Sequence, residues 1–190
     1  MLRQMYEGTF SGHITSLDFQ AKATELLNTD IFKSICNYEG ICTVAGLAVH
    51  PYGLETVTNN KKTNKYIGLH LDSWDNLSLL ERHLSTNRIC INLSDESRYF
   101  LFLNLSIAQL FEISGSNENI IPDLLCLDFM KNNPNYPIVK LELKPFEAYI
   151  APTENIIHDA TTENMQSDSF SFTYRGRFKL TPQYSINKKV

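Results

Sequence analysis

The sequence predicts a mainly β fold, an antiparallel barrel or sandwich with one or two helices packed at its N-terminal side. One stretch with helical spacing of apolar residues is followed by seven or eight short segments with strand-like patterns. The chain has 190 residues, of which 43% are hydrophobic, and this is enough for one sizeable core. We therefore expect a single domain over residues 1–190, with an N-terminal arm and helix over 1–40 and the β core over 41–180.

The first elements follow from a change in residue pattern near Gly40. Residues 17–36 place apolar side chains at helical spacings, with a break near Asn28. From residue 41 the chain becomes rich in β-branched residues, and we expect strands over 41–49 and 66–71. The segment from residue 73 begins as a loop and is expected to form a short helix near 77–83.

The rest of the chain alternates between short strands and polar turns. The polar run 94–97 separates two strand-like segments, residues 106–113 have a helical pattern, and an Asn-Pro-containing run at 132–135 indicates a turn. We expect strands over 88–93, 98–105, 138–143, 148–150 and 169–178.

Composition excludes several classes of function. The formal charge of −4 and a pI near 5.7 argue against a general binder of nucleic acid or of acidic membranes. The four cysteines form no CxxC pair, which argues against a zinc knuckle or a disulfide framework. The residues after Met1 lack the apolar stretch of a secretory signal, and no apolar run is long enough to span a bilayer. We expect a cytoplasmic protein that takes a small-molecule, amino-acid or peptide-like substrate.

The most informative motif is the pair His70 and Asp72. Side chains at positions i and i+2 of a strand point to the same face, so an imidazole and a carboxylate would project together. His158, at the end of a later apolar run, can complete a set of two histidines and one carboxylate. Such a set leaves coordination positions open on one side of a non-haem iron.

Other histidines are weaker candidates for the third ligand. His83 lies in an expected helix, and His13 lies in the N-terminal arm. His50 precedes the His-x-Asp pair, which is the wrong order along the chain. A single histidine is also more often a hydrogen-bonded or solvated residue than a metal ligand.

The order of these elements resembles the Fe(II)/2-oxoglutarate-dependent oxygenase superfamily. The segment 144–152 is similar to the turn and strand that precede the distal histidine in that family, with Pro145 and Glu147 matching and Phe146 in place of glycine. Residues 87–91 resemble the Arg-x-His strand of proline- and aspartyl-hydroxylase relatives, with Cys90 where histidine is expected. The resemblance covers about residues 41–180.

The resemblance implies a double-stranded β-helix (a jelly-roll, cupin-like) in which His70, Asp72 and His158 hold Fe(II). The co-substrates would be 2-oxoglutarate and O2, with succinate and CO2 as co-products. The carboxylate of Asp72 favours hydroxylation or desaturation over halogenation, because related halogenases carry a small residue there.

The distal carboxylate of 2-oxoglutarate needs a cation, and a guanidinium suits it best. Residues 169–178 alternate between an aromatic face and a polar face that carries Arg175 and Arg177. Arg175 is the preferred anchor, Arg177 is the second choice, and Arg88 and Arg98 are alternatives on earlier strands. The polar face could also be solvent-exposed.

Several further residues are candidates for secondary roles. Tyr66 and Asn92 could contact the co-substrate or substrate, because each is expected to share a strand face with a site residue. Trp74 and Asp75 could form a lip over the metal, and Asp159 could orient an imidazole. Each of these could equally be an ordinary packing residue.

These observations predict an oxygenase that hydroxylates or desaturates an unactivated C–H bond. One alternative is a cupin-type metal enzyme that does not use 2-oxoglutarate, although cupins usually supply more histidines than this chain has. Another is a non-enzymatic β-sandwich binding module in which the His-x-Asp pair is incidental.

Overall fold

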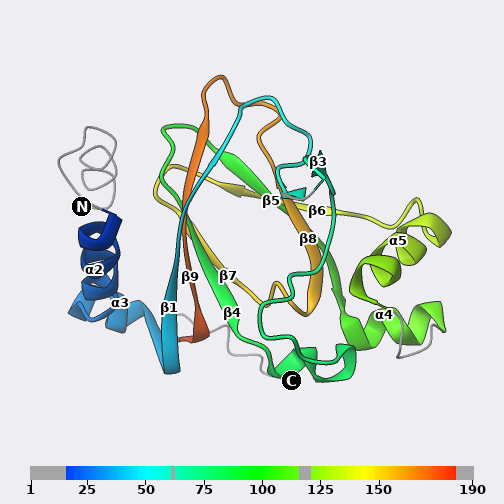
Figure 1. Ribbon diagram of the computed structural model, residues 1–190, viewed down its shortest axis with the longest axis horizontal. Coiled ribbons are helices and arrows are strands. Elements are labelled where there is room, and N and C mark those ends of the chain that lie inside the picture. The colour runs from blue at the N-terminus through cyan, green and yellow to red at the C-terminus, as the bar shows by residue number, and fades with distance from the viewer. Residues whose placement is uncertain (1–15, 61–62, 116–120, 183–190) are drawn as a thin grey trace.

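The computed structural model describes residues 16–60, 63–115 and 121–182, and in them the chain is mainly β (Figure 1). The first sheet has the order β1-β9-β4-β7, the second has the order β6-β5-β8, and β2 and β3 form a small hairpin. All pairs of neighbouring strands are antiparallel. The strands are β1 (Cys36–His50), β2 (Asn59–Asn60), β3 (Lys65–Tyr66), β4 (Asn87–Asn92), β5 (Arg98–Ser106), β6 (Val139–Leu143), β7 (Ala148–Ala151), β8 (Ile156–Thr161) and β9 (Ser169–Leu180).

Helices flank the strands on both sides, which corrects the prediction that they pack only at the N-terminal side (Figure 1). Helices α2 (Ser16–Leu27) and α3 (Asp30–Ile35) lie against the first sheet. Helices α4 (Ile107–Ser114) and α5 (Pro122–Asn132) pack against the second. Because helices cover the outer face of each sheet, the two inner faces enclose the interior of the molecule.

Strand β9 contributes polar side chains to the space between the two sheets. Phe172 and Tyr174 are fully buried against α2, and the Tyr174 hydroxyl donates a 2.9 Å hydrogen bond to the Ala23 carbonyl. The alternate side chains, including Ser171 and Arg175, are also buried. From Ser169 to Arg175 the polar face of this strand therefore points into the molecule, and the alternative that it faces solvent is wrong there; beyond it, Arg177 is exposed.

The sequence missed α5 entirely. Its first residue is Pro122, which has no N–H to lose at that position, and this is typical of a helix start. Leu125 and Phe129 are fully buried and join the core that α4 forms with Leu103 of β5. Apolar residues make up most of α5 and surround the helix, so no single helical stripe stands out in its sequence.

Helix α4 was predicted closely. A capping box defines its start: the Ser106 side chain accepts from the Gln109 N–H, and the Gln109 side chain accepts from the Ser106 N–H. Gly115, with φ of 60°, ends the helix.

The N-terminal prediction holds in its main point. The helical stretch breaks before α3, whose N-cap Thr29 accepts a 3.2 Å hydrogen bond from the Phe32 N–H. A short helix was expected near residues 77–83, and the structure has a 3-10 helix there, η1 (Leu79–Leu84). The arm over 1–15, with His13, lies outside the described residues.

The expected strand over 66–71 is wrong in detail. Strand β3 ends at Tyr66, and Gly68 takes a left-handed backbone conformation with φ of 71°. His70 then pairs with His158 in an isolated antiparallel bridge. Strand β8 also runs through His158, whereas the sequence placed this histidine at the end of an apolar run and no strand was expected there.

None of the helices in the described part of the chain is both long and apolar enough to cross a membrane.

Candidate metal centre

Two histidines and one aspartate converge at the edge of the second sheet. Nε2 of His70 lies 3.6 Å from Oδ1 of Asp72, and Nε2 of His158 lies 3.8 Å from Oδ2. All three ligand atoms lie within 4.8 Å of one another. Ligands at about 2.0–2.2 Å from a shared ion are themselves roughly 3–4 Å apart, so this spacing suits one metal ion.

The ring nitrogens of both histidines are oriented for this role. Nδ1 of His70 lies 2.9 Å from the Gly68 carbonyl oxygen, and Nδ1 of His158 lies 3.2 Å from that of Ile156. A carbonyl oxygen only accepts, so each Nδ1 carries the proton and each Nε2 presents a lone pair toward Asp72. Nε2 of His158 is buried and has no hydrogen-bond partner among the described residues. A buried lone pair without a donor indicates that something else occupies the space before it.

The backbone fixes the relative position of the three ligands. His70 and His158 exchange backbone hydrogen bonds of 3.0 and 2.9 Å across their bridge. The Asp72 N–H donates a 3.1 Å hydrogen bond to the Thr153 carbonyl. These bonds tie the segment 70–72 to β8 and to the turn before it. Although residues 70–72 are not a regular strand, they are extended enough that both side chains reach the same side.

Burial and charge keep two of the three ligands, His158 and Asp72, in their metal-binding protonation states. Burial, reinforced by the nearby Arg88 guanidinium, lowers the pKa of His158 to about 3, so this imidazole is neutral at physiological pH. Burial alone would raise the pKa of Asp72, but the neighbouring histidines and Arg88 lower it well below its usual range. Metal ligands must be deprotonated to bind, and His158 and Asp72 meet this condition. Burial alone would lower the pKa of His70, but its hydrogen bonds to Asp72 and to the Gly68 carbonyl raise it, so a metal ion at this site would compete with a proton for this imidazole.

Two of the three ligands are partly open to solvent. The side chains of His70 and Asp72 are each 11% exposed, whereas that of His158 is 1% exposed. A metal ion held here would therefore be supported from within by His158 and open outward past the other two ligands.

A network of buried charges lies behind Asp72. Nη1 of Arg175 lies 3.3 Å from Oδ2 of Asp72, and its Nη2 lies 2.5 Å from Oε1 of Glu154. Glu154 is fully buried and also receives the Asp75 N–H at 3.1 Å. Arg82 extends the network, because its guanidinium donates to the Asp72 carbonyl and lies 4.0 Å from Glu154.

The sequence predicted Arg175 as the co-substrate anchor, and the structure brings it next to the metal ligands. However, both of its terminal nitrogens are already engaged by carboxylates, and Nη2 also donates to the Thr86 hydroxyl at 3.1 Å. Its guanidinium lies 5.3 Å from the centre of the Trp74 ring. These contacts suit a residue that positions Asp72.

A second polar group of residues surrounds a cavity of about 90 Å³ between the two sheets. Arg88, Arg98 and Tyr149 line it together with His158, so the cavity extends to the metal ligands. Arg88 donates a 2.8 Å hydrogen bond to the Tyr149 hydroxyl and lies 3.4 Å from Oδ2 of Asp72. The other lining residues are Ala48, His50, Val57, Thr58, Cys90, Asp159, Ala160, Ser171 and Thr173.

Arg98 is the most unusual residue of this cavity. It is only 4% exposed, and its Nε and Nη1 have no hydrogen-bond partner within the described part of the chain. Asp159 borders the same cavity, but its carboxylate accepts a 2.7 Å hydrogen bond from the Thr58 hydroxyl and forms no ion pair with Arg98. A buried guanidinium without a counter-charge is costly, and it indicates a place for an anion.

The structure does not bring three other predicted residues to the site. Arg177 is exposed and lies opposite Glu39 on β1. Tyr66 is 48% exposed at the end of β3 and lines neither the cavity nor the pocket beside His70. Asn92 is buried, but its amide donates to the carbonyls of Glu96 and Leu143 and so closes a turn.

The remaining candidates lie close to the site in other roles. Trp74 is 62% exposed beside Arg175, and the Asp75 carboxylate accepts from the Thr86 N–H and hydroxyl. Cys90 lines the interior cavity. Of the rival histidines, His83 is exposed in η1, whereas His50 lines the cavity and contributes no ligand to the triad.

Sequence reasoning missed Glu154, Arg82 and Tyr149. Glu154 lies two residues after Pro152 in what reads as a solvent-exposed turn, and Arg82 lies in an apparently amphipathic helix. For Tyr149 the one available signal was its position two residues before Ala151 in a short strand, because side chains two residues apart share a face.

No family model, curated protein or solved structure matches the chain. The functional interpretation therefore rests on the geometry described above.

Proposed function

We propose that this protein is an Fe(II)- and 2-oxoglutarate-dependent oxygenase that hydroxylates or desaturates an unactivated C–H bond. The observation that carries the proposal is the convergence of His70, Asp72 and His158 beside a cavity that contains an unpaired buried arginine. Two imidazoles and one carboxylate with open positions are the ligand set of non-haem Fe(II) oxygenases.

The donor atoms fit such an ion. Both Nε2 atoms face Asp72 as lone pairs, and Nε2 of His158 is buried without a partner. Two nitrogen ligands and one oxygen ligand favour a transition metal over Ca²⁺ or Mg²⁺, which prefer oxygen ligands.

The strand order supports a jelly-roll. With the extended segment at His70 counted as the second of eight strands, the first sheet holds strands 1, 8, 3 and 6 in that order. The second sheet then holds strands 5, 4, 7 and 2. This alternation between two facing sheets supports the proposed double-sheet jelly-roll.

Arg98 is our candidate for the anchor of the 2-oxoglutarate distal carboxylate. It projects into the cavity that His158 also lines, and its free nitrogens can form charge-assisted hydrogen bonds with a carboxylate. Arg175, whose nitrogens are engaged by Asp72 and Glu154, instead holds the carboxylate ligand in place. Arg88 and the Tyr149 hydroxyl lie between these two regions.

When bound, Fe(II) and 2-oxoglutarate would supply the oxidant for the C–H bond, with succinate and CO2 as co-products. The protein's own residues hold His158 and Asp72 deprotonated and orient the two imidazoles through backbone carbonyls. His158 is enclosed, so the exposed side of His70 and Asp72 is the side from which a substrate would approach.

Succinate formation tests this proposal. Protein supplied with Fe(II), 2-oxoglutarate, ascorbate and air should release succinate, and His158→Ala and Asp72→Ala should release none above background. Arg177→Ala, which changes an exposed arginine on β9, should behave like the unaltered protein. Equal succinate formation by the triad variants would contradict the proposal.

A further inference from the structure

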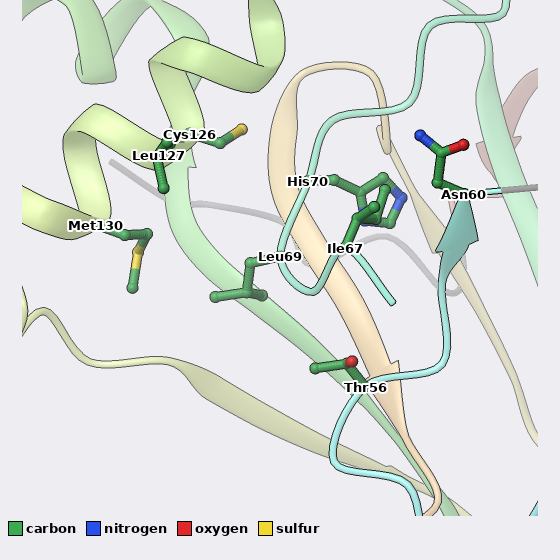
Figure 2. Close-up of a pocket in the computed structure, with 8 residues that line it drawn as sticks. All are labelled: Thr56, Asn60, Ile67, Leu69, His70, Cys126, Leu127 and Met130. Atoms are coloured by element: carbon green, nitrogen blue, oxygen red, sulfur yellow. The ribbon is translucent and has the colours of Figure 1, made fainter. Parts of the chain in front are cut away.

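A second, larger pocket lies on the exposed side of the triad and is largely apolar. It measures about 590 Å³, within the roughly 300–1,000 Å³ that is usual for small-molecule sites. His70 is one of its lining residues, so the pocket borders the candidate metal centre (Figure 2). The described residues around it are Thr56, Asn60, Ile67, Leu69, His70, Cys126, Leu127 and Met130.

The two ends of the pocket differ in chemistry. Figure 2 shows Cys126, Leu127 and Met130 projecting from α5 at one end, while His70 and Asn60 lie at the other. Ile67 is 45% exposed and Leu127 is 64% exposed, so apolar side chains also form the rim. Such exposure costs free energy unless a ligand covers the apolar surface.

The lining also indicates what the pocket would reject. None of its described side chains carries a formal charge at neutral pH apart from the titratable His70, so a buried ammonium or carboxylate would lose hydration without gaining a counter-charge. Thr56 and Asn60 offer a hydroxyl and an amide, which suit an uncharged polar group such as an amide.

We infer that this pocket binds the group to be oxidised and that the group is an uncharged aliphatic side chain on an amide-containing molecule. The claim that the bound group is oxidised rests on the proposed function, whereas the claim that the pocket binds it does not. The aliphatic part extends from Leu127 and Met130 past Leu69 to Ile67, at the end of the pocket where His70 lies (Figure 2). The carbon to be oxidised would be the one nearest His70.

Methionine methyl signals test the binding without any metal. In protein labelled with [methyl-¹³C]methionine, N-acetyl-leucinamide should shift the Met130 signal saturably and leave that of Met165, which is buried outside the pocket, unchanged. The signal of Met130 is identified with Met130→Leu. N-acetyl-lysinamide and N-acetyl-glutamic acid amide should give no saturable shift at the same concentrations.

Two matched variants give the control. Leu127→Glu should weaken binding of the leucine probe by about tenfold or more, because it places a charge against the aliphatic group. Ile113→Glu, on α4 and 52% exposed outside the pocket, should leave the affinity unchanged. Both residues are exposed, so neither change should unfold the protein.

The possible results separate the two claims. An unchanged Met130 signal with the leucine probe, or equal shifts with all three probes, would overturn the inference about the pocket. A selective shift of Met130 supports it. If the shift occurs and succinate formation with Fe(II) and 2-oxoglutarate is absent, the pocket assignment stands and the proposed reaction fails.

Discussion

Asp72 is surrounded by more positive partners than a single metal ligand needs. Arg88 and Arg175 both approach its Oδ2, at 3.4 and 3.3 Å, and the two histidines approach from the other side. The two arginines differ in what else they contact: Arg175 is held by Glu154, whereas Arg88 contacts Tyr149 beside the interior cavity. This difference separates the residues that position the metal ligand from those that face the cavity.

The first prediction concerns the unpaired arginine. Arg98→Gln should weaken binding of 2-oxoglutarate by about 100-fold, because a charge-assisted contact of roughly 1.5–3 kcal/mol is lost. Affinity for Co(II), used as a stable probe of the metal site, should remain within a few fold. Both are measured by calorimetry. If Arg98→Gln binds 2-oxoglutarate normally and Arg175→Gln does not, the anchor is Arg175.

The second prediction concerns the buried carboxylate behind the triad. Glu154→Gln should lower the free energy of unfolding by about 3–5 kcal/mol, because it removes one charge from a buried ion pair. Glu163→Gln is the control: its pair with Lys140 is 3.7 Å long and solvent-exposed, so its loss should cost about 0–1 kcal/mol. Urea unfolding measures both, and equal effects would contradict the buried role of Glu154.

The third prediction concerns pH. Burial, with the charges of Arg98 and Arg88, lowers the pKa of His50 in the folded protein from 6.5 to about 4. The unfolded chain therefore takes up this proton first, and His50 makes the folded state lose stability as the pH falls from 6.5 to 4. His50→Gln should flatten that decline in unfolding free energy. Identical slopes for the two proteins would show that His50 titrates normally when folded.

At the scale of elements, the turn before His70 is decisive. Gly68 has φ of 71°, and its carbonyl accepts from Nδ1 of His70. Only glycine adopts this conformation without strain, so the turn that breaks the expected strand also sets the imidazole.

Gly68→Ala should therefore do two things. It should cost about 1–2 kcal/mol of stability, since a side chain is forced into the left-handed region, and it should weaken Co(II) binding through displacement of His70. Gly53→Ala, with φ of 75° in a separate turn, should cost similar stability and leave Co(II) affinity unchanged. If both variants bind Co(II) equally well, the turn does not set the ligand.

The sequence predicted some elements of the structure better than others. Most strands were predicted within a few residues, because alternation and polar turns are local signals. The segment 66–71 was wrong because its isolated bridge depends on β8, about 90 residues away. The sequence could not decide between Arg175 and Arg98 for a similar reason. Alternation predicts which face of a strand a side chain occupies, but it does not predict that Arg175 forms an ion pair with Glu154 on that face.

At the scale of the whole molecule, one pair of helices lies on each side of the two sheets (Figure 1), and three functional regions adjoin one another within this frame. An interior cavity with Arg98 lies on one side of His158, and an apolar pocket bordered by α5 lies beside His70. The metal ligands connect the two. A co-substrate and a substrate could thus bind at the same ion from separate sides.

The most direct test of this account is an anaerobic titration of 2-oxoglutarate into protein loaded with Fe(II). In the resembled family, chelation of the iron by this co-substrate gives a visible charge-transfer band. We expect a saturable band in the unaltered protein and none in His158→Ala, because Nε2 of His158 is buried beside Asp72 without a hydrogen-bond partner among the described residues. A protein that binds Fe(II) but gives no band would contradict the use of 2-oxoglutarate, and one that binds no Fe(II) would contradict the metal centre itself.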